Sequence, residues 1–143
     1  MKITAVDALK VRVPIKGDYR MAKGVHKALD SVLVRVVTDE GIVGVGDIHQ
    51  GVAGYTSETV DTIFSIIKGA YAPVLVGQEL DSPERLHRLL TEERMGNPFA
   101  RSGIEMAIFD ILGKQAGLSV AGLLGGPVRK SILLSGGIGI ETP

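Results

Sequence analysis

Residues 97–126, which read NPFARSGIEMAIFDILGKQAGLSVAGLLGG, decide how the second half of this chain folds. Asn97 can cap a helix with its side chain, Pro98 suits the first helical position, and Gly125–Gly126 stops the segment. Between these marks, apolar residues recur at the spacing of one helix face: Ile104, Ala107, Ile108, Ile111 and Leu112. The pattern predicts a long buried helix from Pro98 and a short helix near residues 120–124.

The first 48 residues alternate instead with the period of β-strands. Strands are predicted at residues 3–13, 30–38 and 42–48, with a tight turn between the last two. Pro14 is expected to end the first strand, and residues 15–27 to form a polar, glycine-containing loop. These strands predict a three-stranded antiparallel sheet. One face of the first strand is expected to carry Ile3, Ala5, Leu9, Val11 and Val13, opposite Lys10 and Arg12.

From Thr56 onward the period becomes helical. Thr56 or Ser57 can cap a helix that ends near Gly69, and an apolar connector follows it. Ser82 can cap a further helix that ends at Gly96. Because the strands precede the helices, the predicted fold class is α+β, with the sheet followed by a helical bundle.

Residues 129–135, RKSILLS, predict one more strand with apolar residues on both of its faces. Such a strand requires cover on both sides, as in a parallel sheet. We therefore expect residues 1–126 to form one domain and residues 127–143 to begin a second one. The alternative is that this strand joins the N-terminal sheet as its fourth member.

The composition argues against several classes of partner. Acidic and basic residues balance at 16 each, so no net charge favours nucleic acid or an anionic membrane. There is no cysteine, and hence no disulfide and no thiolate metal site. No apolar run approaches the ~20 residues of a membrane span, and the N-terminus is unlike a signal peptide. We expect a cytoplasmic protein with no nucleic-acid or membrane partner.

The segment from Ala100 to Gly125 resembles the signature of the mandelate racemase and muconate lactonizing enzyme family of the enolase superfamily. It departs from the family pattern at Ile108 and Ser119, where the changes conserve size or turn function. The resemblance extends over the whole chain, and GNPFARSGIE and LVGQ are most similar to muconate cycloisomerases. The matching positions are Ala100, Gly103, Ile104, Glu105, Ala107, Asp110, Gly113, Lys114, Ser119, Leu123, Leu124 and Gly125.

The resemblance implies an α+β capping domain followed by a (β/α) barrel, and an isomerase or lyase as the intact enzyme. In this family a barrel base removes the proton α to a carboxylate, and Mg²⁺ or Mn²⁺ on three acids stabilises the enediolate. The muconate branch interconverts a diacid and its lactone. Active sites lie at the C-terminal ends of barrel strands, so we expect no catalytic residue and no metal ligand in this chain. The intact protein is expected to be a homo-oligomer.

The capping domain of the family places two loops over the barrel mouth, where they shape the specificity for a small carboxylate substrate. By position these loops are residues 17–26 and 48–55 of this chain. Each side chain also has a plainer interpretation as an exposed loop residue or, for Tyr55, as packing at the sheet edge. The candidate substrate-binding residues are Met21, Lys23, Val25, His26, His49 and Tyr55.

Several polar residues suggest chemistry but are better explained by structure. Asp47 and His49 share a strand face, yet two ligands without a third make a poor metal site. The pairs Arg101–Glu105 and Asp110–Lys114 have the i,i+4 spacing of helical ion pairs, which favours a structural role. His87 is expected at the surface of its helix, among charged neighbours.

Alternative functions remain open within and beyond the family. The resemblance also admits dipeptide epimerase, N-acylamino acid racemase, o-succinylbenzoate synthase and acid-sugar dehydratase. A freestanding α+β module that binds a ligand or partner without catalysis is the alternative of another class. A terminal strand without a partner argues against such a module.

Overall fold

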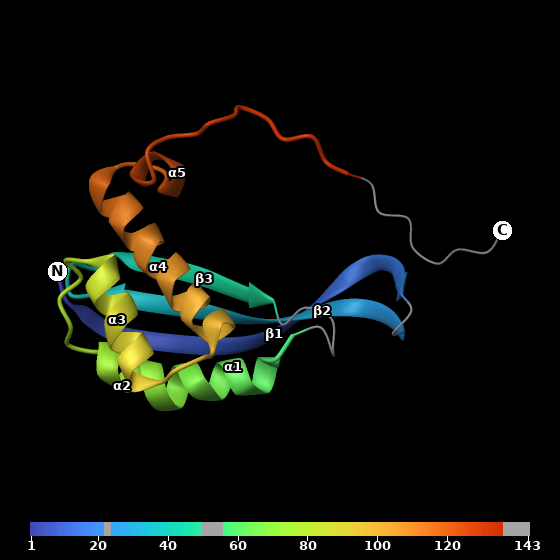
Figure 1. Cartoon of the computed structure of the whole chain (residues 1–143), viewed down its shortest axis with the longest axis horizontal. Helices are drawn as coiled ribbons and strands as arrows, with labels where there is room; N and C mark the ends of the chain where they lie inside the picture. Colours follow the sequence, from blue (N-terminus) through green and yellow to red (C-terminus); the bar gives the residue numbers. More distant parts are fainter. Residues whose placement is uncertain (22–23, 50–55, 136–143) are drawn as a thin grey trace.

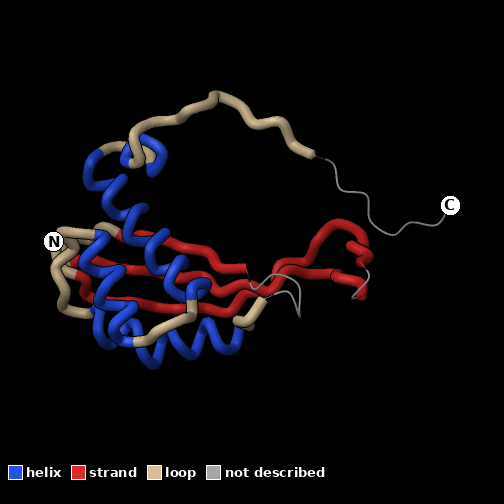
Figure 2. The backbone as a smooth tube through the Cα atoms, viewed as in Figure 1, coloured by secondary structure: helices blue, strands red, loops and turns tan. Residues whose placement is uncertain are grey.

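A computed structural model describes residues 1–21, 24–49 and 56–135 (Figures 1 and 2). Its first half is a three-stranded antiparallel sheet of order β1–β2–β3, formed by β1 (Ile3–Met21), β2 (Gly24–Thr38) and β3 (Val43–His49). The β2–β3 turn is closed by Thr38, whose hydroxyl donates to the Ile42 carbonyl at 3.0 Å. The predicted sheet is confirmed.

Helices follow the sheet and cover one of its faces (Figure 1). They are α1 (Val60–Ile66), the π-helical turn η1 (Ile67–Tyr71), α2 (Ala72–Leu75), α3 (Pro83–Glu93), α4 (Pro98–Ala116) and α5 (Val120–Leu123). Val32, Val34 and Val36 of β2 are fully buried beneath this layer, together with Ile104 and Ile111 of α4. The α+β class and the buried stripe of α4 are confirmed. No helix in the described part of the chain is long and apolar enough to cross a membrane.

Helix α4 lies directly against β3 because glycines remove the side chains between them. A Cβ atom at Gly46 would lie 2.0 Å from the carbonyl oxygen of Gly103, and one at Gly44 would lie 2.0 Å from that of Ala107. No side chain fits at such a distance, so the backbones of helix and strand meet. The glycines of the IVGVG hairpin therefore serve packing.

The prediction that residues 15–27 form a loop is wrong. β1 and β2 continue past Pro14 as a hairpin arm, in which Tyr19 pairs with His26 and Arg20 with Val25. Pro14 lies on an edge strand and interrupts the ladder without ending it, since the register shifts between Pro14 and Tyr19 and pairing then resumes. We call residues 14–21 and 24–28 the hairpin arm.

The predicted face of β1 is also wrong beyond its first residues. A register shift between Ile3 and Ala5 turns Val6 toward the core, so that Leu9 and Val13 point away from the helices and are 61% and 52% exposed. Residues of β2 and β3 that pair with these outward positions lie on the same side of the sheet, because side chains alternate between the two faces along each strand. We call this surface the open sheet face, defined by Asp7, Leu9, Val13, Leu29, Leu33, Arg35 and Val45.

One predicted helix start is corrected and another is confirmed. Thr59, not Thr56 or Ser57, caps α1, and its side chain and that of Thr62 form a capping box. Helical structure then continues through Gly69 as a π-turn to Leu75, because Tyr71 and Leu75 fill the core, so the predicted connector is largely helical. Ser82 caps α3 as predicted, by accepting from the Arg85 amide at 3.2 Å.

Residues 129–135 form no strand in the structure, contrary to the prediction. They pair with no strand of the described sheet, which also excludes them as its fourth strand. Ile132, Leu133 and Leu134 are almost fully exposed, and a strand requires a partner backbone that the described residues do not provide. The domain boundary after residue 126 stays a prediction.

Candidate functional site

The hairpin arm projects beyond the helical layer (Figure 1). Val25 is 52% exposed and Met21 is half-buried. These two candidates therefore lie on a two-stranded ribbon with fixed pairing, which is a more rigid support than the predicted loop. Lys23 and Tyr55, two further candidates, lie outside the described residues.

His26 is the candidate with the most informative environment. Its ring lies on the arm opposite Tyr19, and its Nε2 atom is buried without a hydrogen-bond partner within the described residues. An unsatisfied buried polar atom costs free energy, so such atoms often mark a position where a ligand or water completes the hydrogen bond. His26 can therefore offer Nε2 to a polar atom of a bound molecule.

His49 lies at the end of β3, is exposed, and contacts the Asp30 carbonyl oxygen through Nδ1 at 3.0 Å. This contact favours the tautomer with the proton on Nδ1, since a carbonyl only accepts. His49 is opposite Ser31, five residues along β2 from His26, so about 17 Å of strand separates the two levels. The structure thus places both histidines toward the same end of the sheet without bringing them into one cluster.

The charge on the arm suits an anionic ligand. Residues 14–28 contain four basic side chains and one acid: Lys16, Arg20, Lys23 and Lys27, against Asp18. Asp18 lies 3.8 Å from Arg20 and both side chains are substantially exposed, so this pair contributes little to stability. The net positive charge of residues 14–28 favours binding of a carboxylate.

The described residues do not form a metal site. No group of three or more His, Asp or Glu side chains among them is arranged to hold an ion. Asp47 and His49 share a face as predicted but find no third ligand in this part of the chain. The expectation that the metal ligands lie elsewhere stays a prediction.

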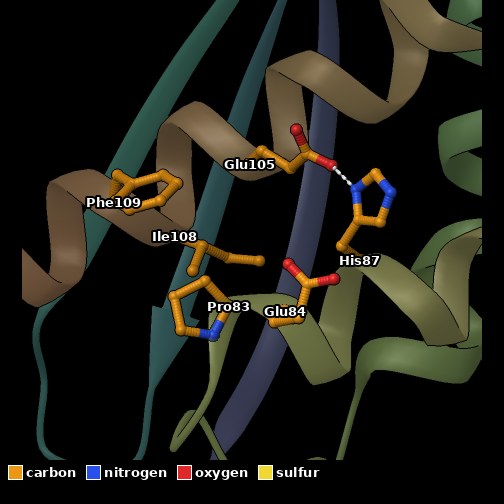
Figure 3. Close-up of a pocket in the computed structure, with 6 residues that line it drawn as sticks. All are labelled: Pro83, Glu84, His87, Glu105, Ile108 and Phe109. Atoms are coloured by element: carbon orange, nitrogen blue, oxygen red, sulfur yellow. Dashed lines mark hydrogen bonds and ion pairs between the residues drawn. The ribbon is translucent and has the colours of Figure 1, made fainter. Parts of the chain in front are cut away.

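A small pocket between α3 and α4 shows how the signature residue Glu105 is used (Figure 3). Its carboxylate contacts Nδ1 of His87, which is half-buried between the two helices. The predicted Arg101–Glu105 pair is wrong, because Arg101 instead donates to the Gly96 carbonyl at 3.2 Å. The prediction that His87 is a surface residue is also corrected, because its ring contacts Glu105 between the two helices. The pocket holds about 110 Å³, well below the 300–1,000 Å³ of typical ligand sites, so its role is structural.

The other signature pair ties α4 to the edge of the sheet. Lys114 donates to Asp110 at 2.7 Å, as predicted, and also to the Val43 carbonyl at 2.7 Å. Asp110 accepts in addition from the Val45 backbone amide at 2.9 Å. The hydrogen bond from Lys114, helped by that from Val45, lowers the pKa of Asp110.

Glu58 is a buried polar residue that the sequence analysis missed. It is 5% exposed, and its carboxylate accepts from the backbone amides of Phe99 and Ala100 at 2.7 and 3.2 Å. Glu58 thus caps α4 in place of Asn97, which adopts a left-handed conformation and makes no capping hydrogen bond. No local spacing signals a cap that comes from another part of the chain.

The geometry therefore defines a class: a small sheet with a helical layer, a projecting basic arm and no catalytic cluster within the described residues. The family model of the "Mandelate racemase / muconate lactonizing enzyme, N-terminal domain" matches residues 3–125. The chain belongs to this family, as the resemblance of residues 100–125 predicted.

The relatives include a racemase and cycloisomerases. N-succinyl-L-Arg/Lys racemase of Bacillus cereus is 32% identical over 145 aligned residues, which cover 100% of this chain and 38% of that protein. Chloromuconate cycloisomerase of Cupriavidus pinatubonensis is 35% identical over 134 residues, covering 92% of this chain and 36% of that protein. The chain thus spans little more than a third of the length of these relatives.

Solved structures agree with the fold. The muconate lactonizing enzyme of Pseudomonas fluorescens, complexed with muconolactone, superimposes with a TM-score of 0.85 at 34% identity, over 90% of this chain and 35% of that one. A mandelate racemase/muconate lactonizing enzyme of Roseovarius nubinhibens, complexed with magnesium, gives a TM-score of 0.90 at 25% identity, over 99% of this chain and 38% of that one. The sheet and helices described above are thus the N-terminal domain of the enolase-type fold.

Proposed function

We propose that this chain is the substrate-capping, specificity-determining part of a divalent-metal-dependent isomerase or lyase that acts on a small carboxylate. The observation that carries the proposal is the hairpin arm. It projects beyond the helices, is rich in basic side chains, and carries Met21, Val25 and His26 on a paired ribbon, with the Nε2 atom of His26 buried and without a partner among the described residues. Such an arm can cover an anionic substrate and exclude water from it.

In this proposal, residues beyond the described part of the chain carry out the chemical step. The reaction is removal of a proton α to a carboxylate, and a divalent cation would balance the charge that develops on the carboxylate oxygens. The described residues offer no three-ligand site for that cation, so we assign the base and the metal ligands to a part of the protein beyond them. The chain contributes the arm, which binds and orients the substrate.

For the substrate we favour a muconate-like diacid. A second carboxylate gives the basic arm a group to bind while the first is held at the reacting centre. An N-acylated amino acid is the second candidate, favoured by the 32% identity to the N-succinyl-L-Arg/Lys racemase. Dipeptides, succinylbenzoate precursors and acid sugars are the remaining alternatives.

The first experiment reads the coding sequence beyond codon 143. We expect an in-frame continuation with a Lys-x-Lys strand and three acids at the ends of successive strands. A natural stop codon after Pro143 would contradict the proposal and favour the freestanding binding module.

The second experiment measures exchange of the α-proton with deuterated solvent by the longer protein, supplied with Mg²⁺ and either a muconate-type diacid or an N-succinyl amino acid. An N-succinyl amino acid loses its α-proton to give the enediolate, whereas a diacid gives the enediolate by ring closure and then takes up a proton, so deuterium should appear at the α-carbon of the amino acid or of the lactone product. Exchange with only one of the two substrates shows whether the protein acts as a cycloisomerase or as an N-acylamino acid racemase. The same measurement is then made with a dipeptide, a succinylbenzoate precursor and an acid sugar, and no exchange with any of the five substrates would exclude the proposed reaction.

A further inference from the structure

The outer edge of β3 carries backbone groups that no strand of the described sheet pairs. The strand order is β1–β2–β3, so β3 has a neighbouring strand on one side only. The Ile42 carbonyl accepts from the Thr38 amide at 3.1 Å, and β3 then pairs with β2 without a register shift. Because backbone direction alternates along a strand, Val43 and Val45 turn their amides and carbonyls away from β2. Such an edge is a template for one more strand.

Two side chains of α4 already occupy this edge. The Lys114 Nζ atom donates to the Val43 carbonyl at 2.7 Å, and Asp110 accepts from the Val45 amide at 2.9 Å. Lys114 thus supplies the donor, and Asp110 the acceptor, that the backbone of a fourth strand would otherwise provide. The two side chains also bond to each other at 2.7 Å, which holds both of them in place one helical turn apart. We call Asp110 and Lys114 the edge cap.

A glycine of β3 allows the edge cap to reach the strand. A Cβ atom at Gly44 would lie 2.0 Å from the Ala107 carbonyl oxygen, so a glycine at this position lets α4 lie on the backbone of β3. Gly44 stands between Val43 and Val45, the two residues that the edge cap binds. A helix held further away would leave both side chains out of hydrogen-bond range. The close packing and the edge cap therefore belong to one arrangement.

The chain itself contains a segment that could pair with an open β3 edge. Residues 129–135 carry the sequence pattern of a strand but pair with no strand of the described sheet, and Leu133 among them is 100% exposed. The segment follows α5, whose first residue, Val120, lines one groove together with Val45 and Asp110. The segment therefore begins close to the edge that the edge cap occupies.

We propose that the edge cap prevents any further strand from pairing with β3 at Val43 and Val45, whether that strand comes from residues 129–135 or from a second molecule. Later residues of the protein that cover this region would not replace the edge cap, because both backbone groups already have partners in α4. The inference is independent of the proposed function, since it concerns only how the sheet ends. It gives Asp110 and Lys114 of the family signature a role beyond the stability of one helix.

The double variant Asp110→Leu/Lys114→Met tests the proposal, because it removes the acceptor and the donor and keeps side chains of similar size. Hydrogen exchange of the 143-residue chain, read by mass spectrometry, is measured in parallel with sedimentation velocity. We expect exchange of the amides of residues 132–134 to slow about tenfold or more when the segment pairs with β3. Pairing with a second molecule would instead appear as a new dimer with slower exchange at Val43. Unchanged exchange at both places overturns the proposal, whatever the sedimentation shows.

Two control variants separate an open edge from a loss of stability. Asp110→Asn removes the charge but keeps a carbonyl oxygen for the Val45 amide, so it should behave as the unmodified chain in both measurements. Lys10→Met/Asp61→Leu makes the same two changes in an ion pair that joins β1 to α1 through side chains, and should also leave both measurements unchanged. Slower exchange at residues 132–134 in either control overturns the proposal. If circular dichroism shows that the double variant does not fold, Asp110→Leu alone, which still frees the Val45 amide, carries the same expectation.

Discussion

The Oε1 atom of Glu58 lies 2.7 Å from the backbone nitrogen of Phe99, 41 residues later in the chain. A buried carboxylate from the segment before α1 thus caps the first turn of α4. The positive end of the helix dipole and two free backbone amides make this position favourable for a negative charge. The contact joins the start of the helical layer to the helix that carries the family signature.

We expect Glu58→Ala to lower the free energy of unfolding by about 1–3 kcal/mol, because it leaves the amides of Phe99 and Ala100 buried without acceptors. Urea unfolding followed by circular dichroism measures the change. Glu93→Ala, at the exposed end of α3, is the matched control and should remain within about 0.5 kcal/mol of the unmodified chain. Equal stability of the two variants would contradict the capping role.

The contact between α4 and β3 predicts a strong effect at Gly46. A Cβ there would lie 2.0 Å from the Gly103 carbonyl oxygen, and neither backbone can move without displacing the core. Gly46→Ala should therefore cost about 3 kcal/mol or more. Gly69→Ala is the control, since a Cβ at this helical position meets nothing within 4 Å and should be neutral or stabilise by up to about 1 kcal/mol. Similar melting temperatures for the two variants would disprove the close packing.

The Asp110–Lys114 contact predicts a dependence on pH. The pKa of Asp110 is lowered in the folded chain, so its contribution to stability is present above the unfolded value of 3.8 and is lost as pH falls through the folded value. Asp110→Asn should lower the free energy of unfolding by about 0.5–1 kcal/mol at neutral pH, a modest value because the carboxylate is one-third exposed. The difference should shrink below pH 4 when unfolding is measured across the acid range. A difference that stays constant or grows with acidity would argue against the assignment.

Sequence patterns correctly predicted the features that depend only on residues close together in the sequence. The stripe of α4, the Ser82 cap and the Asp110–Lys114 pair follow from spacing along one helix, and the structure confirms them. The hairpin arm was missed because Pro14 and the polar residues after it are typical of loops, whereas the pairing of Tyr19 with His26 depends on a partner strand. The Asn97 cap failed for a similar reason, since Glu58 reaches α4 only in the folded chain.

The candidate site residues stay a prediction, while the structure corrects the form of the segment that carries Met21, Val25 and His26 from a loop to a paired ribbon. Their position came from the resemblance to the family, which places two loops over the substrate. The sequence carries no sign that the Nε2 atom of His26 is buried without a partner among the described residues, because burial depends on which residues surround the ring in the folded chain. The interpretation of His26 as a substrate contact belongs to the proposed function and leads to a direct test.

Alanine substitutions of His26 and His87, the two described histidines outside β3, test whether His26 contacts the substrate. His26→Ala removes a ring whose Nε2 has no partner among the described residues, so the free energy of unfolding should change by less than about 0.5 kcal/mol. If the proposed function holds, His26→Ala in the longer protein should raise KM for the carboxylate severalfold and leave kcat nearly unchanged, as expected for a side chain that holds the substrate and does not transform it. His87→Ala should do the reverse: it removes the Glu105 contact between α3 and α4, lowers stability by about 1 kcal/mol, and leaves KM unchanged. Steady-state kinetics and urea unfolding of both variants separate the roles, and an unaltered KM for His26→Ala would remove His26 from the site.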